Sequence, residues 1–200
     1  MSTKTKVKIG CLDLTFCPIA SESAGALPTY EAATNELSLG HAVRAALSVE
    51  TSELRVYGDD ALQISADLFK QGKLDTEALL DDLALEAALY GSTTSTDAVT
   101  DGGDDASPAG AVYYVQKLMK KDKSLVYRGV ILYRCEASRA DYTDESDTKG
   151  ETIEPKNHPV SFVVMLTNSN VWRWRKDFTS ESDALSAIAG ILHPTNSGTT

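Results

Sequence analysis

The side chains that could do chemistry in this 200-residue chain are few and scattered. The three histidines, His41, His158 and His193, stand far apart, and none has a cysteine or carboxylate at the spacing of a metal site or a catalytic triad. His158 precedes Pro159 at the start of a predicted strand, which is typical of a turn or capping residue rather than a general base. No glycine-rich phosphate loop follows a predicted strand. The sequence therefore predicts a protein that is not an enzyme.

The cysteines and one acidic segment are the remaining candidates for a metal site. Cys11, Cys17 and Cys135 contain no CxxC motif, and their odd number fits a reducing cytosol, so we interpret them as small buried or half-buried apolar residues. The acidic segment DGGDD at 101–105 has the composition of a calcium loop, but it lacks the alternating ligands and the terminal glutamate. We expect no metal and no cofactor.

Composition narrows the class of protein further. A hydrophobic content of 42% is enough for a sizeable core, and the length fits one domain. The formal net charge of −10, from 29 acidic and 19 basic residues, disfavours tight binding to nucleic acid or to an anionic membrane. The sequence contains no apolar run long enough for a membrane span, and its first ten residues, MSTKTKVKIG, lack the apolar core of a signal peptide. We expect a soluble protein made in the cytoplasm, without a membrane anchor.

Strand patterns dominate the chain. The segment LVYRGVILYRCEAS at 125–138 alternates apolar and polar residues, so we expect Ile131, Tyr133 and the other odd-numbered apolar side chains to be buried, with Arg128 and Arg134 facing solvent. A second strand, within GETIEPKNHPVSFVVML at 150–166, follows a polar loop. The other elements are predicted to pack on this pair.

Five further strands and a C-terminal helix are predicted. In the first predicted strand the apolar residues alternate on one face up to Cys11 and on the other face from Leu12, and a bulge near Gly10 would bring both sets to the same side. Pro18 is predicted to end this strand. Ser180 caps a helix that ends at Pro194. The five strands are predicted at residues 6–16, 41–50, 54–57 before a turn at 58–60, 111–119 and 171–178.

The segment LDTEALLDDLALEAALY at 74–90 leaves two interpretations open. Its pattern permits one helix of four turns or a strand followed by a helix, and its composition favours helix. With Asp81 or Asp82 as the N-terminal cap and Gly91 at the end, we expect a helix over 82–90.

Three segments carry too little apolar sequence to be core elements. Residues 21–36 and 92–110 are predicted to be loops, rich in small and polar residues. Residues 140–150 are predicted to be an extended hairpin loop with almost nothing to bury. Long ordered loops in compact domains tend to be functional, so this hairpin loop is the first candidate for an assembly contact.

The alternation of Trp172 and Trp174 with Arg173 and Arg175 also has two interpretations. Interleaved aromatic and basic residues can bind single-stranded nucleic acid. In a chain this acidic, we instead expect the indole rings to pack and the arginines to pair with carboxylates.

The order of these motifs resembles the phage major tail proteins of the type named after staphylococcal phage phi13, the tail tube subunits of long-tailed phages. The likeness covers most of the chain, and the residues Thr148, Lys149, Gly150 and Glu151 match the family's hairpin loop. Pro155 stands where relatives usually have phenylalanine, and we expect no counterpart of the C-terminal domain that some relatives append. The motifs that carry the resemblance are KTKVKIGCLDLTFCPIA, VYGDD, GKLDTEALLDDLALEAALYG, YRGVILYRCEAS, ESDTKGETIEPKNHPVSF and VWRWRKDFTSESDAL.

The resemblance implies a mainly β fold with minor α: a β-sandwich of the tail-tube type flanked by one helix, with long loops and a short C-terminal helix. It places a strand from Gly72 to about Leu80 before the helix, and one domain over residues 1–194 with a flexible tail at 195–200. It further implies hexameric rings that stack into a tube within the virion, through which phage DNA passes without specific binding. The implied partners are the tape measure, tail terminator and distal tail proteins.

Two sets of candidate site residues follow, together with one alternative function. A β-sandwich adhesion or ligand-binding module is the alternative to the tail tube. The candidates for oligomer contacts are the polar residues of the hairpin loop, Tyr142, Asp144, Glu145, Thr148, Lys149, Gly150 and Glu151. The candidates for facing the tube lumen are acids in polar turns, Asp59, Asp60, Asp101, Asp104 and Asp105.

Overall fold

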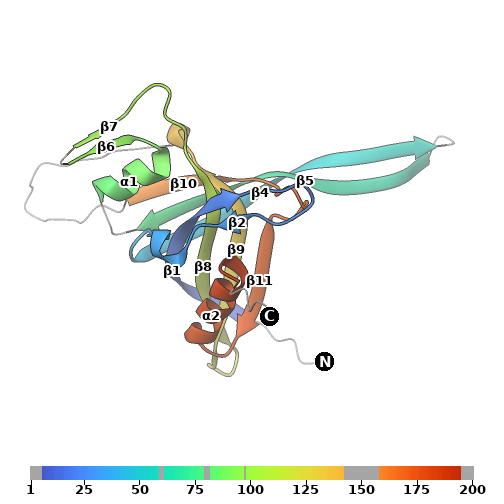
Figure 1. Ribbon diagram of the computed structural model, residues 1–200. Helices are drawn as coiled ribbons and strands as arrows, with labels where there is room; N and C mark the ends of the chain where they lie inside the picture. Colours follow the sequence, from blue (N-terminus) through green and yellow to red (C-terminus); the bar gives the residue numbers. More distant parts are fainter. Residues whose placement is uncertain (1–5, 59–60, 79–81, 97, 142–157, 195–200) are drawn as a thin grey trace, which may run out of the picture.

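The computed structural model describes residues 6–58, 61–78, 82–96, 98–141 and 158–194, and strands make up most of them (Figure 1). Two α-helices, α1 (Leu83–Tyr90) and α2 (Glu181–Leu192), and two single 3₁₀ turns (Ala33–Asn35 and Arg139–Asp141) accompany the strands. The strands are β1 (Lys6–Ser21), β2 (Thr29–Tyr30), β3 (Leu37–Ser38), β4 (Ala42–Gly58), β5 (Ala61–Ala78), β6 (Thr93–Ser95), β7 (Ala98–Thr100), β8 (Ala109–Lys120), β9 (Leu125–Ala137), β10 (His158–Val164) and β11 (Arg173–Phe178).

Hydrogen bonds join nine of the described strands into one antiparallel sheet with the order β2-β1-β8-β9-β10-β5-β4. Strand β11 pairs with the first part of β9 and β10 with its last part, while β3 pairs with β1. Strands β6 and β7 form a separate hairpin inside the predicted loop at 92–110. The predicted class, mainly β with minor α, is confirmed. Its finer description as a β-sandwich of the tail-tube type stays a prediction, since nine of the described strands belong to one continuous hydrogen-bonded sheet.

The sheet curves around an inner cluster of apolar side chains. Phe16 of β1 and Phe162 of β10 stack with ring centroids 5.9 Å apart, although β8 and β9 lie between their strands in the sheet. Curvature therefore brings the two sides of the sheet together. The inner cluster comprises the buried side chains of Leu14, Phe16, Leu39, Leu74, Leu85, Leu89, Tyr90, Val112, Tyr114, Val130, Leu132, Cys135, Ala137, Val160, Phe162 and Val164.

A second, outer cluster covers the opposite face of β8 and β9 under helix α2. It comprises Cys17, Ala111, Val115, Ile131, Tyr133, Ala184, Ile188 and Leu192. The prediction that β9 has one buried and one polar face is therefore wrong. Val130 and Leu132 are as buried on the inner side as Ile131 is on the outer side, because the sheet lies between two apolar layers.

Both helices begin and end as their sequences predict. The Asp82 side chain accepts a hydrogen bond from the backbone of Ala84, and Gly91 ends α1 with a φ of 71° in the left-handed region. In α2 the Ser180 hydroxyl accepts a hydrogen bond from the backbone of Asp183. The strand-then-helix interpretation of residues 72–90 is confirmed, since β5 runs to Ala78 and α1 begins at Leu83.

The first strand is longer than predicted. Its register shifts between Lys8 and Gly10, which confirms the bulge near Gly10. Pro18 does not end it, because Pro18 lies opposite Gly110 of β8 and its carbonyl still accepts a hydrogen bond from Glu31. Proline lacks an N–H donor but keeps its acceptor, so a strand beside short neighbours such as β2 tolerates it.

The segments predicted as two strands at 41–50 and 54–57 form one strand, β4. The apolar residues change face along it, because Leu47 and Val49 line the inside of the sheet whereas Leu54 lies on the opposite face. In a sequence, a change in the face that carries the apolar residues indicates the end of one strand and the start of another. In the structure it marks the point where β4 leaves the body of the protein.

Candidate assembly arm and arginine cleft

Strands β4 and β5 form an arm that projects from the body of the protein (Figure 1). Strand β10 pairs with β5 only from Gly72 to Ala78, so in the described chain the hairpin beyond Gly72 has two strands and no third. Eight residues of extended strand, from Thr51 to Gly58, span about 25 Å at roughly 3.3 Å per residue. An isolated two-stranded hairpin is marginally stable in water, so a chain that covered this arm would stabilise it.

One face of the arm is apolar and exposed. Leu54 lies opposite Ala66, and Leu68 lies opposite Ser52, so these four side chains share a face. Leu54 is 45% exposed and Leu68 is 52% exposed. Nearer the body the same face is charged, with ion pairs between Arg44 and Glu77 and between Lys70 and Glu50. We call Ser52, Leu54, Ala66 and Leu68 the apolar arm face.

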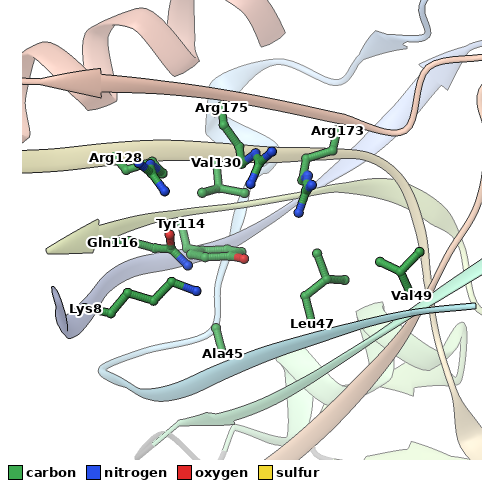
Figure 2. Close-up of a pocket in the computed structure, with 10 residues that line it drawn as sticks. All are labelled: Lys8, Ala45, Leu47, Val49, Tyr114, Gln116, Arg128, Val130, Arg173 and Arg175. Atoms are coloured by element: carbon green, nitrogen blue, oxygen red, sulfur yellow. The ribbon is translucent and has the colours of Figure 1, made fainter. Parts of the chain in front are cut away.

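A cleft of about 130 Å³ opens between the root of the arm and the body. Figure 2 shows apolar side chains of β4 on one side of this cleft and basic side chains of the body on the other. We call it the arginine cleft, and its lining consists of Lys8, Ala45, Leu47, Val49, Tyr114, Gln116, Arg128, Val130, Arg173 and Arg175. The described lining residues thus include four cations and no carboxylate, in a chain whose net charge is −10.

One of the four cations is already paired. Arg128 holds Asp177 with two hydrogen bonds, Nε to Oδ1 at 2.6 Å and a second guanidinium nitrogen to Oδ2 at 3.2 Å, and Lys6 also contacts Asp177. The hydrogen bond from Arg128, followed by that from Lys6, lowers the pKa of the Asp177 carboxyl to about 2 although partial burial opposes the shift. Arg128 therefore belongs to a structural ion pair.

Arg173 and Arg175 differ from Arg128, since neither forms an ion pair with a carboxylate in the described parts of the chain. The expectation that these arginines pair with carboxylates is not met there. Arg173 lies over the Trp172 ring, with its guanidinium carbon 4.2 Å from the ring centroid. Burial and the neighbouring charge of Arg175 both lower the pKa of Arg173.

The two tryptophans also divide between the two apolar layers. Trp172 packs against the inner cluster and Trp174 against the outer cluster. The indole rings do pack, as expected.

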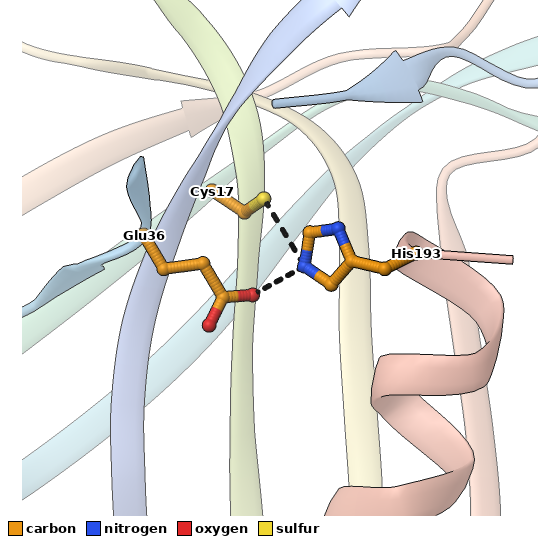
Figure 3. Close-up of side chains that lie close together, drawn as sticks. All are labelled: Cys17, Glu36 and His193. Carbon is orange, nitrogen blue, oxygen red and sulfur yellow. Dashed lines mark hydrogen bonds and ion pairs between the residues drawn. The ribbon is translucent and has the colours of Figure 1, made fainter. Parts of the chain in front are cut away.

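A second group of polar side chains converges beside the end of α2 (Figure 3). The Nε2 atom of His193 lies 2.8 Å from a carboxylate oxygen of Glu36 and 4.0 Å from the Cys17 sulfur. The hydroxyl of Tyr113 donates to the other oxygen of Glu36 at 2.8 Å. Cysteine, histidine and glutamate are all zinc ligands, and the three donor atoms lie within 4.8 Å of one another. These are the described residues that could hold a metal ion.

The chemistry of this group is that of a structural contact rather than a nucleophile. A Cys–His–Glu triad needs one ring nitrogen toward the thiol and the other toward the carboxylate, but here Nε2 faces both. Burial, followed by the charge of Glu36, raises the pKa of the Cys17 thiol to about 12, so the thiol is neutral at physiological pH. The contacts connect the end of α2 to β1 and to the residue before β3.

The predicted assembly residues lie outside the described part of the chain. This applies to Tyr142, Asp144, Glu145, Thr148, Lys149, Gly150 and Glu151, and also to the lumen candidates Asp59 and Asp60.

The other lumen candidates cluster in the turn before β8. Asp101 and Asp104 are exposed there. Asp105 accepts hydrogen bonds from the Gly102 backbone at 2.7 Å and from Arg139 at 3.1 Å, so its carboxylate already has partners within the chain.

Sequence reasoning missed the arm, the arginine cleft and the Cys17 group. The arm left a misleading signal, because the change of apolar face between Leu47 and Leu54 is the pattern of two separate strands. The Cys17 group left none, since Cys17, Glu36 and His193 come from distant parts of the sequence.

Comparison with known proteins identifies no relative of this chain. The chain matches no protein-family model and no curated protein. Within the described residues, the helices are too short or too polar to cross a membrane.

Proposed function

We propose that this protein is a structural subunit that assembles with copies of itself, as a phage tail tube protein does. In this proposal hexameric rings stack into a tube in the virion, and phage DNA passes through the tube without specific binding. Tape measure, tail terminator and distal tail proteins are the partners expected at its ends. The subunit carries out no catalytic step.

The observation that carries the proposal is the β4–β5 arm. Among the described residues, its outer part has two strands, exposes Leu54 and Leu68 on one face, and has β4 at the edge of the sheet. Unpaired strand edges and exposed apolar side chains are surfaces that a second chain can cover. When the arm of one copy reaches a different surface on the next copy, the contact is head-to-tail, and such contacts close into rings.

Two further features support a structural assembly over an enzyme and over a DNA-binding protein. The Cys17 group lacks an activated nucleophile, because the pKa of its thiol is raised and one histidine nitrogen serves both neighbours. The net charge of −10 also favours a passage for DNA over a DNA-binding surface, since like charges repel within a Debye length of about 8 Å at physiological salt.

Electron microscopy of the concentrated full chain, with sedimentation velocity over the same concentration range, tests this function. We expect rings and short tubes, with a sedimentation coefficient that rises with concentration. A single monomer boundary from micromolar to millimolar protein, with no rings on the grid, would contradict the proposal.

A further inference from the structure

The arginine cleft holds positive charge that the described chain does not neutralise. The guanidinium of Arg128 is paired with Asp177, but Arg173 and Arg175 form no ion pair among the described residues. Arginine stays charged in proteins, so it cannot relieve its repulsion by losing a proton. Arg173 is half-buried and Arg175 beside it is exposed, so an anion bound between them would offset the cost of removing Arg173 from water. Among the described residues, the cleft therefore presents two arginines without a carboxylate partner.

We propose that the arginine cleft binds a carboxylate side chain from a second copy of this chain. The choice of a second copy as the source of the carboxylate rests on the self-assembly proposed above. The claim that the cleft is an anion site stands without self-assembly.

Geometry favours a single carboxylate group as the occupant. Figure 2 shows Arg173 and Arg175 on one side of the cleft and Leu47 and Val49 on the other. The guanidinium fork donates two parallel hydrogen bonds to a carboxylate, while the apolar wall excludes water from one side. A volume of about 130 Å³ accommodates the end of one acidic side chain but not a nucleic-acid strand.

Neutral polar groups complete the site. Tyr114 and Gln116 line the cleft, and burial raises the pKa of the Tyr114 hydroxyl to about 12, so this hydroxyl keeps its proton. A hydroxyl and an amide can each donate a hydrogen bond to a bound carboxylate.

Charge complementarity supports a second copy as the source of the carboxylate. Each chain carries 29 acidic side chains against 19 basic ones, so other copies present an excess of carboxylates at any surface contact. The apolar wall of the cleft is the root of β4, the strand that continues into the arm. A carboxylate bound here would therefore hold a neighbouring copy against the base of the arm.

Binding to the isolated subunit tests the site without assembly. Glutarate, which ends in the same group as a glutamate side chain, is titrated at constant ionic strength into dilute monomeric protein while tryptophan emission is followed. Arg173 lies over the Trp172 ring, so an anion on Arg173 should change this emission. In the Arg173→Gln/Arg175→Gln variant the affinity should fall by about tenfold or more, because charge-assisted hydrogen bonds are lost.

The matched control removes the same charge elsewhere. Lys121→Gln/Lys123→Gln changes two exposed lysines in the turn between β8 and β9, outside the cleft, and should leave glutarate affinity unchanged. Equal binding by the wild type and the Arg173→Gln/Arg175→Gln variant would overturn the site. Binding of inorganic phosphate without binding of glutarate would overturn the choice of a carboxylate.

A second measurement tests the source. If the wild type assembles, the arginine variant should need about ten times more protein to reach the same fraction assembled, whereas the lysine variant should match the wild type. Equal assembly by both variants would show that no second copy occupies the cleft. Failure of the wild type to assemble would contradict the proposed function and the source, while the glutarate titration would still decide whether the anion site exists.

Discussion

The ring of Phe69 stacks on the indole of Trp172, with centroids 4.6 Å apart and planes inclined by 16°. Phe69 stands where the arm leaves the sheet, beside the register shift between Glu50 and Thr51. Trp172 belongs to the segment before β11 and packs against the inner cluster. This contact joins the root of the arm to the body, and Arg173 of the arginine cleft lies over the same Trp172 ring.

Replacing Phe69 should loosen the root of the arm. In Phe69→Ala we expect a loss of about 2 kcal/mol in the free energy of unfolding, because a half-buried ring and its stacking contact disappear. Backbone hydrogen exchange should rise in β4 and β5 but not in β8. Leu68→Ala, one residue away on the exposed face, should cost less than about 0.5 kcal/mol in urea titrations. Equal losses for the two variants would contradict a role of the Phe69–Trp172 stack.

Gly110 should tolerate no side chain. A Cβ atom there would lie 2.4 Å from the Phe16 ring and 2.7 Å from the Cys17 carbonyl oxygen, so Gly110→Ala must push buried groups apart. We expect it to cost about 2 kcal/mol or more by thermal or urea unfolding. Gly103→Ala is the matched control, since a Cβ atom at that position meets no atom within 4 Å. Wild-type stability of Gly110→Ala would show that β1 and β8 do not pack this closely.

The Asp177 ion pair should make stability depend on pH in acid. Its pKa is lowered from 3.8 to about 2 in the folded protein, so its contribution is present above about pH 4 and is lost as the pH falls toward 2. Because Asp177 is partly exposed, we expect Asp177→Asn to cost only about 1 kcal/mol at pH 7. Urea titrations at pH 7, 5 and 3 should show the gap between variant and wild type narrowing at the lowest pH. A gap of the same size at all three pH values would contradict the ion-pair account.

Local chemistry made much of the fold predictable. The side chains of Asp82 and Ser180 accept hydrogen bonds from backbone N–H groups two or three residues later, and Gly91 adopts a left-handed φ, so these helix signals require nothing from distant residues. The bulge near Gly10 was likewise visible as a change of alternation. By contrast, β9 contains apolar residues on both faces, and a period of two cannot show that helix α2 covers one of them.

The candidate site was far less predictable. The sequence shows Arg173 and Arg175 as a motif, but whether a carboxylate from the described part of the chain reaches them depends on where β4 and β8 lie relative to β11. The arm was not predicted because Leu47 and Leu54 lie on opposite faces of one strand, and in the sequence this pattern looks like two separate strands.

The central claim is that the apolar arm face drives self-assembly, and a two-residue change tests it most directly. In Leu54→Thr/Leu68→Thr the strands keep a residue of high β propensity at both positions while the apolar arm face loses its two large exposed side chains. Thr51→Ser/Ser65→Thr, on the opposite face of the arm, is the control. Sedimentation velocity at a concentration where the wild type assembles should show the leucine variant as monomer, with unchanged circular dichroism, and the control assembled. Normal assembly of the leucine variant would contradict the account.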